Sequence, residues 1–171
     1  VYHPQKRIDE ADTETFEIIS GLFSKDENRV FKSHRTVPAA DSHSFEVFSE
    51  HYSIDSNYYY YDTIAFLSSK DPSFEILGSG YSKTNDKVFH AWYDFKRIYN
   101  YPQPNDYKIS SDIRAVVGAD PKTIKPLEIL SDNPLNQFAK DTSFVFWRAQ
   151  IIDSANPKTF EHVSGHLTRD G

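Results

Sequence analysis

Phe16-Glu17-Ile18-Ile19 recurs as Phe45-Glu46-Val47-Phe48 and again as Phe74-Glu75-Ile76-Leu77, and each copy follows an aspartate after a short spacer. The phenylalanines that open these three copies are spaced by 29 residues each time. Two less regular copies are Leu127-Glu128-Ile129-Leu130 and Phe160-Glu161-His162-Val163. A fixed period of this size is typical of repeat architectures, in which one small supersecondary unit is copied and stacked. The period therefore predicts a scaffold, and we expect such a scaffold to bind rather than to catalyse.

Within each copy, apolar and charged residues alternate, which is the period of a β-strand. Each copy continues through a further apolar residue into a polar cluster of Asp, Asn, Ser and Thr, which are residue types that favour turns. A β-prone run rich in aromatic residues follows each cluster. These runs are Val30-Phe31, Tyr58–Tyr61, Val88-Phe89 and Phe144–Trp147. Each unit is therefore predicted as strand, strand, tight turn, strand, with linkers between the units.

The chain as a whole, residues 1–171, is predicted to be a single all-β domain of antiparallel hairpin repeats of about 29 residues. The repeats would form a curved or closed sheet array, either propeller-like or an open meander or solenoid. An irregular insertion near residues 93–118 breaks the period. Such insertions often carry function, and a surface loop is the equal alternative. Both ends of the chain match one arm of a hairpin, so either the ends pair or the array is longer.

The composition excludes several classes of function. The chain has no cysteine, so it has no disulfide framework and no thiolate metal site. Its aromatic fraction of 15% argues against disorder. No segment reaches the roughly 18 apolar residues of a membrane span. The chain also lacks methionine, so Val1 is not a translation start and we expect a processed or partial chain.

Charge is distributed unevenly along the chain. The net charge is −6, whereas a nucleic-acid-binding protein normally shows a basic excess, so no nucleic-acid partner is expected. Residues 1–85 hold 8 Lys and Arg against 14 Asp and Glu, while residues 86–171 hold 11 of each kind. The acidic half predicts a basic protein partner. Solubility is the plainer interpretation of the same charge.

The run Asp55-Ser56-Asn57-Tyr58-Tyr59 resembles the Asp-Lys-Asn-Tyr-Tyr motif of the DKNYY family of bacterial proteins, with Ser56 in place of the lysine. The surrounding pattern is also similar, from Ala40-Asp41 through Phe45-Glu46-Val47 to Tyr52. The resemblance covers most of the chain apart from roughly residues 93–118. It implies a bacterial, repeat-built protein of the periplasm or cell envelope, with the cytoplasm left open. The family has no established activity, so no functional residue is transferred.

The sequence contains no strong catalytic or metal-binding set, and no cofactor is expected. It lacks a nucleophile elbow, a phosphate-cradling glycine-rich loop and an HExxH motif. His162 and His166 are four residues apart, which on a helix would suit a metal. A strand is predicted there, and residues at this spacing on a strand lie about 13 Å apart. We therefore predict no metal site and no enzymatic activity.

Two groups of residues are the candidate binding residues. The glutamates of the copies, among them Glu46 and Glu75, would line one face if the units stack in register. Like charges in a row repel, so local salt bridges with lysines of the turns such as Lys25 and Lys83, a basic partner or a cation must offset them. A solvated row with local salt bridges is the plainer interpretation.

The second group is aromatic. Tyr58, Tyr59, Tyr60 and Tyr61 would place two rings on each face of one strand, and the same argument applies to Trp92 and Tyr93. Exposed Tyr and Trp are favoured at recognition surfaces, and burial of both faces is the alternative.

The leading hypothesis is a non-enzymatic protein-binding module, a bacterial inhibitor or immunity-type protein that binds a basic partner. A periplasmic or surface glycan-binding module is the second hypothesis, because aromatic platforms also bind sugars. The third is an enzyme with a site split across the units, around His90 or around His162 and His166.

Overall fold

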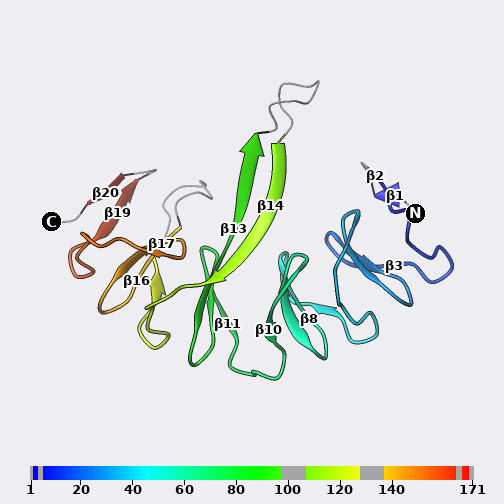
Figure 1. The fold of residues 1–171 in the computed structure, drawn as a ribbon, viewed down its shortest axis with the longest axis horizontal. Coiled ribbons are helices and arrows are strands. Elements are labelled where there is room, and N and C mark those ends of the chain that lie inside the picture. The colour runs from blue at the N-terminus through cyan, green and yellow to red at the C-terminus, as the bar shows by residue number, and fades with distance from the viewer. Residues whose placement is uncertain (1, 4–5, 98–106, 128–136, 165–166, 170–171) are drawn as a thin grey trace. The chain divides into compact units, whose positions relative to one another are not determined.

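A computed structural model describes residues 2–3, 6–97, 107–127, 137–164 and 167–169, and the side chains of residues 8–92, 111–127 and 137–161 (Figure 1). Every regular element in these ranges is a β-strand, and all strand pairing is antiparallel. The prediction of an all-β antiparallel fold is confirmed. No helix capable of crossing a membrane occurs among these residues.

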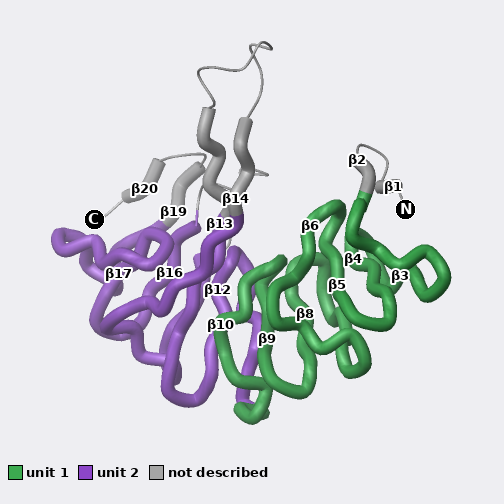
Figure 2. The backbone as a smooth tube through the Cα atoms, turned by 45° about the vertical axis from the view of Figure 1, so that its right-hand side comes forward, with its two compact units in different colours: residues 1–72 green, residues 73–171 purple. Residues whose placement is uncertain are grey.

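The chain divides into two compact units, residues 1–72 (unit 1) and residues 73–171 (unit 2), which Figure 2 colours separately. The expectation of a single domain over residues 1–171 stays a prediction.

Unit 1 contains two four-stranded sheets, each a meander in which consecutive strands pair. The first sheet consists of β3 (Glu17–Ser20), β4 (Phe23–Lys25), β5 (Val30–Lys32) and β6 (Arg35–Thr36). The second consists of β7 (Glu46–Val47), β8 (Tyr52–Ile54), β9 (Tyr58–Tyr61) and β10 (Ile64–Ser68). A two-stranded sheet, β1 (Tyr2–His3) and β2 (Lys6–Arg7), precedes them.

Unit 2 repeats this plan with two further four-stranded meanders. The third sheet consists of β11 (Glu75–Gly78), β12 (Tyr81–Lys83), β13 (Val88–Arg97) and β14 (Tyr107–Ala115). The fourth consists of β15 (Lys125–Pro126), β16 (Phe138–Lys140), β17 (Val145–Trp147) and β18 (Gln150–Ile151). A two-stranded sheet, β19 (Glu161–Ser164) and β20 (Leu167–Arg169), follows them.

The prediction of three strands per repeat was wrong by one strand, because each four-stranded sheet has a fourth strand beyond the three predicted. In three sheets this strand follows a two-residue loop, and the loop begins with a non-glycine residue of positive φ: Ser33 (56°), Asp62 (54°) or Arg148 (57°). Hairpin loops that need positive φ are usually marked by Asn or Gly. None of these three loops begins with Asn or Gly, so the sequence alone does not predict the turn.

The third sheet differs, because β13 continues past this position instead of turning. β13 and β14 pair from Phe89 opposite Ala115 to Arg97 opposite Tyr107, which makes a long hairpin that projects beyond the rest of the sheet (Figure 1). The insertion predicted near residues 93–118 is thus largely an extension of two strands. Residues 98–106 at its tip lie outside the described residues.

Each unit has its own apolar core. In unit 1, Phe23, Val30, Val37, Phe45 and Tyr60 are buried together, and the rings of Phe23 and Phe45 lie 5.7 Å apart. In unit 2, the core residues are Tyr81, Val88, Val116, Ile124, Ala139 and Phe146. The third strand of every four-stranded sheet supplies a side chain to these cores, namely Val30, Tyr60, Val88 or Phe146, which agrees with the β-prone runs of the sequence.

Candidate functional site

The turn between the second and third strands of each sheet is held by one polar side chain. In the second sheet, Asp55 Oδ1 accepts hydrogen bonds from the backbone N–H groups of Asn57 and Tyr58, both at 2.7 Å. Asp55 Oδ2 accepts one from the Asp41 N–H at 2.8 Å and one from the Tyr60 hydroxyl at 2.7 Å. One buried carboxylate therefore closes the turn and also ties it to the segment that precedes the sheet.

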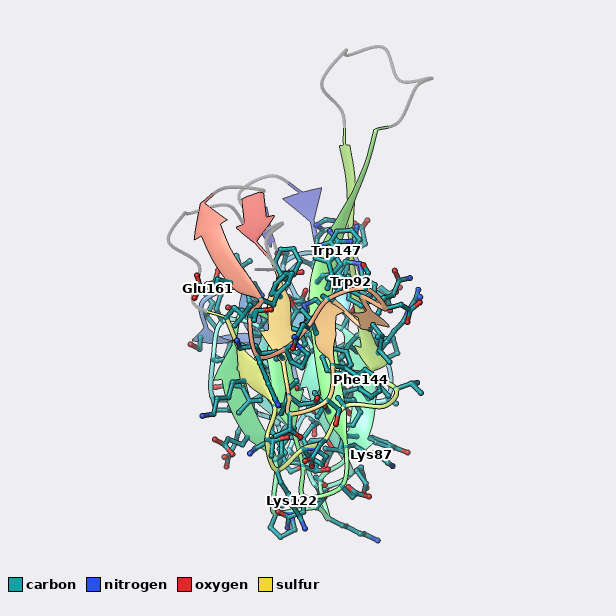
Figure 3. The ribbon with its side chains drawn as sticks, turned by 90° about the vertical axis from the view of Figure 1, so that its left-hand side faces the viewer. Lys87, Trp92, Lys122, Phe144, Trp147 and Glu161 are labelled. Atoms are coloured by element: carbon teal, nitrogen blue, oxygen red, sulfur yellow. The ribbon has the colours of Figure 1, made fainter. Side chains whose placement is uncertain are left out.

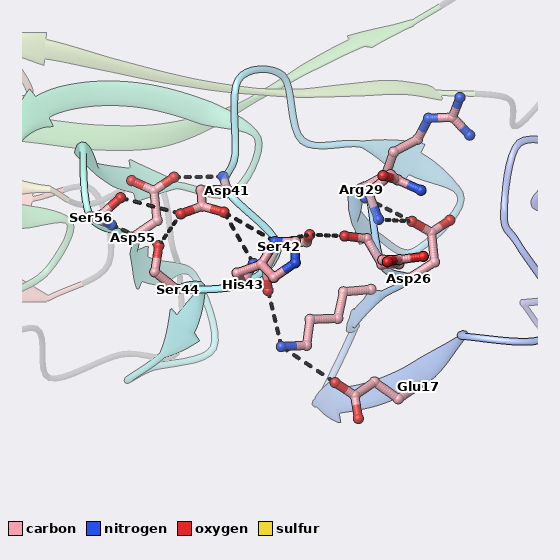
Figure 4. Close-up of polar contacts among 12 residues, drawn as sticks. Glu17, Asp26, Arg29, Asp41, Ser42, His43, Ser44, Asp55 and Ser56 are labelled. Atoms are coloured by element: carbon pink, nitrogen blue, oxygen red, sulfur yellow. Dashed lines mark hydrogen bonds and ion pairs between the residues drawn. The ribbon is translucent and has the colours of Figure 1, made fainter.

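Asp26 and Asp141 act in the same way in the first and fourth sheets, and Figure 4 shows Asp26 with the neighbouring turn of the second sheet. In the third sheet the residue is Thr84, whose hydroxyl receives the Lys87 N–H at 3.2 Å. Thr84 has only one side-chain oxygen, which accepts from the backbone of the turn itself. The two oxygens of aspartate are what the double role requires.

The hydrogen bonds also set the charge state of these aspartates. Burial alone would raise the pKa of Asp55, but the hydrogen bonds from Asp41, Tyr60, Tyr58 and Asn57 outweigh burial and hold the pKa below its ordinary value. The pKa of Asp26 is lowered against burial in the same way by backbone hydrogen bonds. These carboxylates are therefore ionised at neutral pH and fully engaged within the fold.

The recurring glutamates are outward-facing and partly paired. Glu17 forms an ion pair with Lys25 at 3.3 Å, and Glu75 forms one with Lys83 at 3.4 Å. Both lysines lie on strands, directly opposite their glutamates, and not in the turns where the sequence analysis placed them. Glu46 is exposed and has no cation opposite it in the register. Local ion pairing thus offsets part of the predicted carboxylate row.

Some of the residues singled out in the sequence lie outside the described part of the chain. These are Glu128, the side chain of His162, and His166. Glu161 is described and exposed. Among the described residues, no group of three or more His, Asp or Glu side chains could hold a metal ion.

The tyrosine run is buried progressively along β9. Tyr58 is 42% exposed and Tyr59 half-buried, whereas Tyr60 and Tyr61 are buried in the unit. Both faces of the strand are therefore covered at its C-terminal end. Only Tyr58 and Tyr59 present surface to a partner in this conformation, and the binding role of the run stays a prediction.

Unit 1 carries an excess of exposed acidic side chains. Residues 1–72 hold 7 Lys and Arg against 13 Asp and Glu, so the whole net charge of −6 lies in this unit. Its buried acids, Asp26, Asp55 and Asp62, have partners within the fold. The exposed acids are Asp9, Glu10, Asp12, Glu14, Glu17, Glu27, Glu46 and Glu50. The exposed cations among residues 8–72 are Arg29, Arg35 and Lys70.

Unit 2 contains a cleft lined by aromatic and basic side chains. Trp92 on β13 and Trp147 on β17 contribute its two indoles, which lie close together in Figure 3. Arg114 on β14 and Arg148 after β17 also line the cleft, whose volume is about 310 Å³. The side chain of Tyr93, the other candidate on β13, lies outside the described residues.

The two guanidinium groups of the cleft stack on its indoles. Arg148 lies 5.9 Å from the ring centre of Trp92 and 5.0 Å from that of Trp147, while Arg114 lies 5.2 Å from Trp92. Arg114 also forms an ion pair with Asp112 at 2.7 Å. Cation–π contacts of this kind hold an arginine flat against the ring and leave its N–H edge free to donate.

His90, the histidine considered for catalysis, lies directly beneath Trp92. It is fully buried, with its ring 5.5 Å from the ring of Trp92 and 4.4 Å from that of Tyr81. Burial lowers the pKa of His90 to about 3, the nearby Arg148 charge adds to the shift, and the Ser79 backbone opposes it. The Ser79 contact falls short of hydrogen-bond geometry, and neither ring nitrogen has a hydrogen-bond partner among the described residues. His90 is a neutral, inaccessible core residue at neutral pH.

A buried ion pair links the two sheets of unit 1. Lys32 on β5 pairs with Asp62 after β9, and both side chains are less than one-tenth exposed. Lys32 Nζ also donates to the Glu50 carbonyl at 2.9 Å, and the Nδ1 atom of His51 lies 3.1 Å from Asp62 Oδ1. The Glu50 carbonyl and the His51 imidazole give each buried charge a second polar contact. We therefore interpret this cluster as a structural clamp, which holds the first and second sheets together.

Comparison with protein families gives one match, to the model of the DKNYY family over residues 1–113. The chain belongs to the DKNYY family. A comparison with curated proteins found no match, and a comparison with solved structures found none either.

The geometry gives the DKNYY motif of this chain a structural meaning. Asp55, the first position, receives the backbone of the third and fourth positions, Asn57 and Tyr58, and so closes the turn. Ser56, at the lysine position, is exposed and donates from its hydroxyl to Asp41 at 3.3 Å. Tyr58 and Tyr59 then begin β9. In this member of the DKNYY family, the motif builds a hairpin rather than a cluster of converging reactive groups.

Sequence reasoning missed two of the residues that line the cleft of unit 2. Arg114 and Arg148 lie 34 positions apart and carry no motif. They meet because the long hairpin carries Arg114 beside Trp92 while the fourth sheet brings Arg148 to the same ring. The one available signal was that the chain has only two tryptophans and that Arg148 directly follows one of them.

Proposed function

We propose that this chain is a non-enzymatic protein-binding module whose unit 1 binds a basic protein partner. The observation that carries the proposal is the segregation of charge, because eight acids but only three cations are exposed among residues 8–72, while the charges of unit 2 balance in the sequence. Clustered charge of one sign steers and orients an oppositely charged partner. A bacterial inhibitor or immunity-type protein of the periplasm or cell envelope is the concrete form of this proposal.

The scaffold proposed for this function is a repeat of about 29 residues, copied through the chain. The same three features recur at this spacing in the first two sheets: a glutamate on the first strand, an Asp-closed turn and a positive-φ loop. Repeat scaffolds bind through the surface that their copies present together. The proposed array is either closed and propeller-like or an open meander or solenoid.

A tagged pull-down from source-cell lysate, washed at low and at high salt and analysed by mass spectrometry, tests the proposal. We expect one dominant basic protein that is lost at high salt, because exposed charge–charge attraction is screened. Absence of a protein partner at either salt concentration contradicts the proposal.

Matched variants then locate the surface. We expect the triple variant Glu14→Gln, Glu27→Gln, Glu46→Gln of unit 1 to weaken binding of the purified partner. The control variant Asp86→Asn, Asp153→Asn, Glu161→Gln of unit 2 removes the same charge and should bind as the parent chain does. Equal weakening by both variants would mean that only net charge matters.

A glycan-binding module is the second candidate function. The exposed rings of Tyr58, Phe144 and Trp147 favour it, since each is at least 40% exposed. Stacking of sugars on aromatic rings depends little on salt, whereas the acidic surface should bind in a salt-dependent way. Retention on cell-wall fragments at high salt would support this candidate over the first.

A further inference from the structure

The cleft of unit 2 contains a half-buried arginine without an acidic partner. Arg148 forms no ion pair with any acidic side chain among the described residues, and its Nε–H is buried without a hydrogen-bond acceptor. A buried donor left unpaired is costly, and the cost is greater when the group is charged. Arg148 is therefore a charged donor whose charge is not balanced by an acidic side chain among the described residues.

The backbone of Arg148 is held firmly in an unfavourable conformation. Its φ of 57° lies in the left-handed region, which few non-glycine residues adopt. Its N–H donates to the Gln137 carbonyl at 2.8 Å, and its own carbonyl accepts the Tyr81 hydroxyl at 2.7 Å. Because the strained backbone of Arg148 is fixed on both sides, its side chain extends from a defined position towards the two indoles. Such preorganisation reduces the entropy lost when a ligand binds.

The chemistry of the lining selects the ligand. Arg114 and Arg148 supply positive charge, and Gln150 adds an amide at the edge of the cleft. His90 beneath the floor is neutral at physiological pH and adds no charge. A planar carboxylate matches the donor edge of a guanidinium, and indole walls suit the methylene groups that carry a carboxylate in a side chain. The two guanidinium groups favour an anionic ligand in this cleft over a neutral sugar.

We infer that this cleft binds the carboxylate side chains of an acidic peptide segment. Arg148 is the central donor, Arg114 is the second donor, and Trp92 and Trp147 form the walls. The inference stands apart from the proposed function, because it concerns unit 2 and a ligand of the opposite charge. The chain would then be able to engage a basic surface with one unit and an acidic segment with the other.

Intrinsic fluorescence reports directly on this site, because Trp92 and Trp147 are the only tryptophans of the chain. The full chain is titrated with acetylated, amidated hexaglutamate and, in parallel, with hexaglutamine and hexalysine of the same form. We expect a saturable fluorescence change with hexaglutamate alone. Absence of a saturable change up to millimolar hexaglutamate, or an equal change with hexaglutamine, overturns the inference.

Arginine variants test the roles of the donors. We expect Arg148→Gln to weaken hexaglutamate binding by about tenfold or more, because a charge-assisted hydrogen bond is lost. Arg148→Lys keeps the charge but lacks the planar fork, so its affinity should lie between those of the other two proteins. Arg35→Gln, at an exposed arginine of unit 1, is the matched control and should bind as the parent does. Equal affinity of Arg148→Gln and the parent overturns the inference.

Two further measurements keep the result decisive. Thermal melts establish that each variant is folded, and Arg114→Gln gives a second, more exposed position at which affinity should fall. Inorganic phosphate at the same concentration should not compete with hexaglutamate. Full competition by phosphate would overturn the assignment to a peptide carboxylate and indicate a general anion site.

Discussion

At the residue scale, the side chain that holds most of the local structure together is Asp55. Its carboxylate accepts four hydrogen bonds, from the backbone of Asp41, Asn57 and Tyr58 and from the hydroxyl of Tyr60. Asparagine in its place would turn one oxygen into a donor that faces other donors. The acid is therefore needed for its two acceptor atoms, and its charge strengthens each bond.

We predict that Asp55→Ala lowers the free energy of unfolding by about 2–4 kcal/mol, because four donors lose their acceptor in a buried site. Chemical denaturation at pH 7 measures the loss. Asp55→Asn should also destabilise the chain, though by less.

Glu46→Gln on the neighbouring strand is the control and should change the free energy of unfolding by no more than about 0.5 kcal/mol, as is usual at exposed positions. A loss in Asp55→Ala no larger than that of this control would show that water replaces the carboxylate without cost.

At the element scale, the four-stranded sheets depend on what joins them within each unit. In unit 2 a hydroxyl makes the link, since Tyr81 donates to the Gln137 and Arg148 carbonyls of the fourth sheet. In unit 1 the corresponding link is ionic, from Lys32 of the first sheet to Asp62 and the Glu50 carbonyl of the second. The ionic link is more costly to break, because one partner alone leaves a buried charge.

We predict that Lys32→Met destabilises the chain by about 3–5 kcal/mol, the usual cost of removing one partner of a buried ion pair. The double variant Lys32→Met, Asp62→Asn should recover much of this loss, because it leaves no uncompensated charge. Urea unfolding of both variants measures the difference.

Lys70→Met, at an exposed lysine of the same unit, controls for the loss of a positive charge. If Lys32→Met behaved like Lys70→Met, the Lys32–Asp62 contact would not be a clamp between the sheets.

At the scale of the whole molecule, the buried titratable groups predict sensitivity to acid. The pKa of His90 is lowered to about 3, so the unfolded chain binds its proton more readily. The stabilisation from neutral His90 is complete above pH 6.5 and is lost as the pH falls towards 3. The pKa values of Asp26 and Asp55 are lowered as well, so their stabilising contribution is complete above the ordinary aspartate pKa and is lost as the pH falls below it.

We predict that the chain loses about 3 kcal/mol of stability through His90 alone between pH 7.5 and pH 4. His90→Leu should lack this part of the pH dependence, whatever its stability at neutral pH. Denaturant unfolding at several pH values measures the slope of the free energy of unfolding against pH for the parent chain and for His90→Leu. Parallel slopes in the two proteins would show that His90 is not responsible.

Four properties of this protein can be predicted from its sequence: the β class, the family, the positions of the Asp-closed turns and the excess of acid in the first part of the chain. Alternation of residue types, turn-forming residues and charge are local properties, so they can be recognised in the sequence without knowledge of the tertiary structure. The turn aspartates show this clearly, since Asp26, Asp55 and Asp141 bind backbone groups two and three residues further on.

The remaining features depend on tertiary packing. In three of the four-stranded sheets, the fourth strand follows a loop that begins with Ser33, Asp62 or Arg148, and these residue types do not by themselves predict a positive φ. The burial of Tyr60 and Tyr61, and the meeting of Trp92, Arg114 and Arg148, depend on strands that are distant in sequence but packed together. A cleft built by such packing has no local signature, and its chemistry becomes visible only when the sheets of unit 2 are folded.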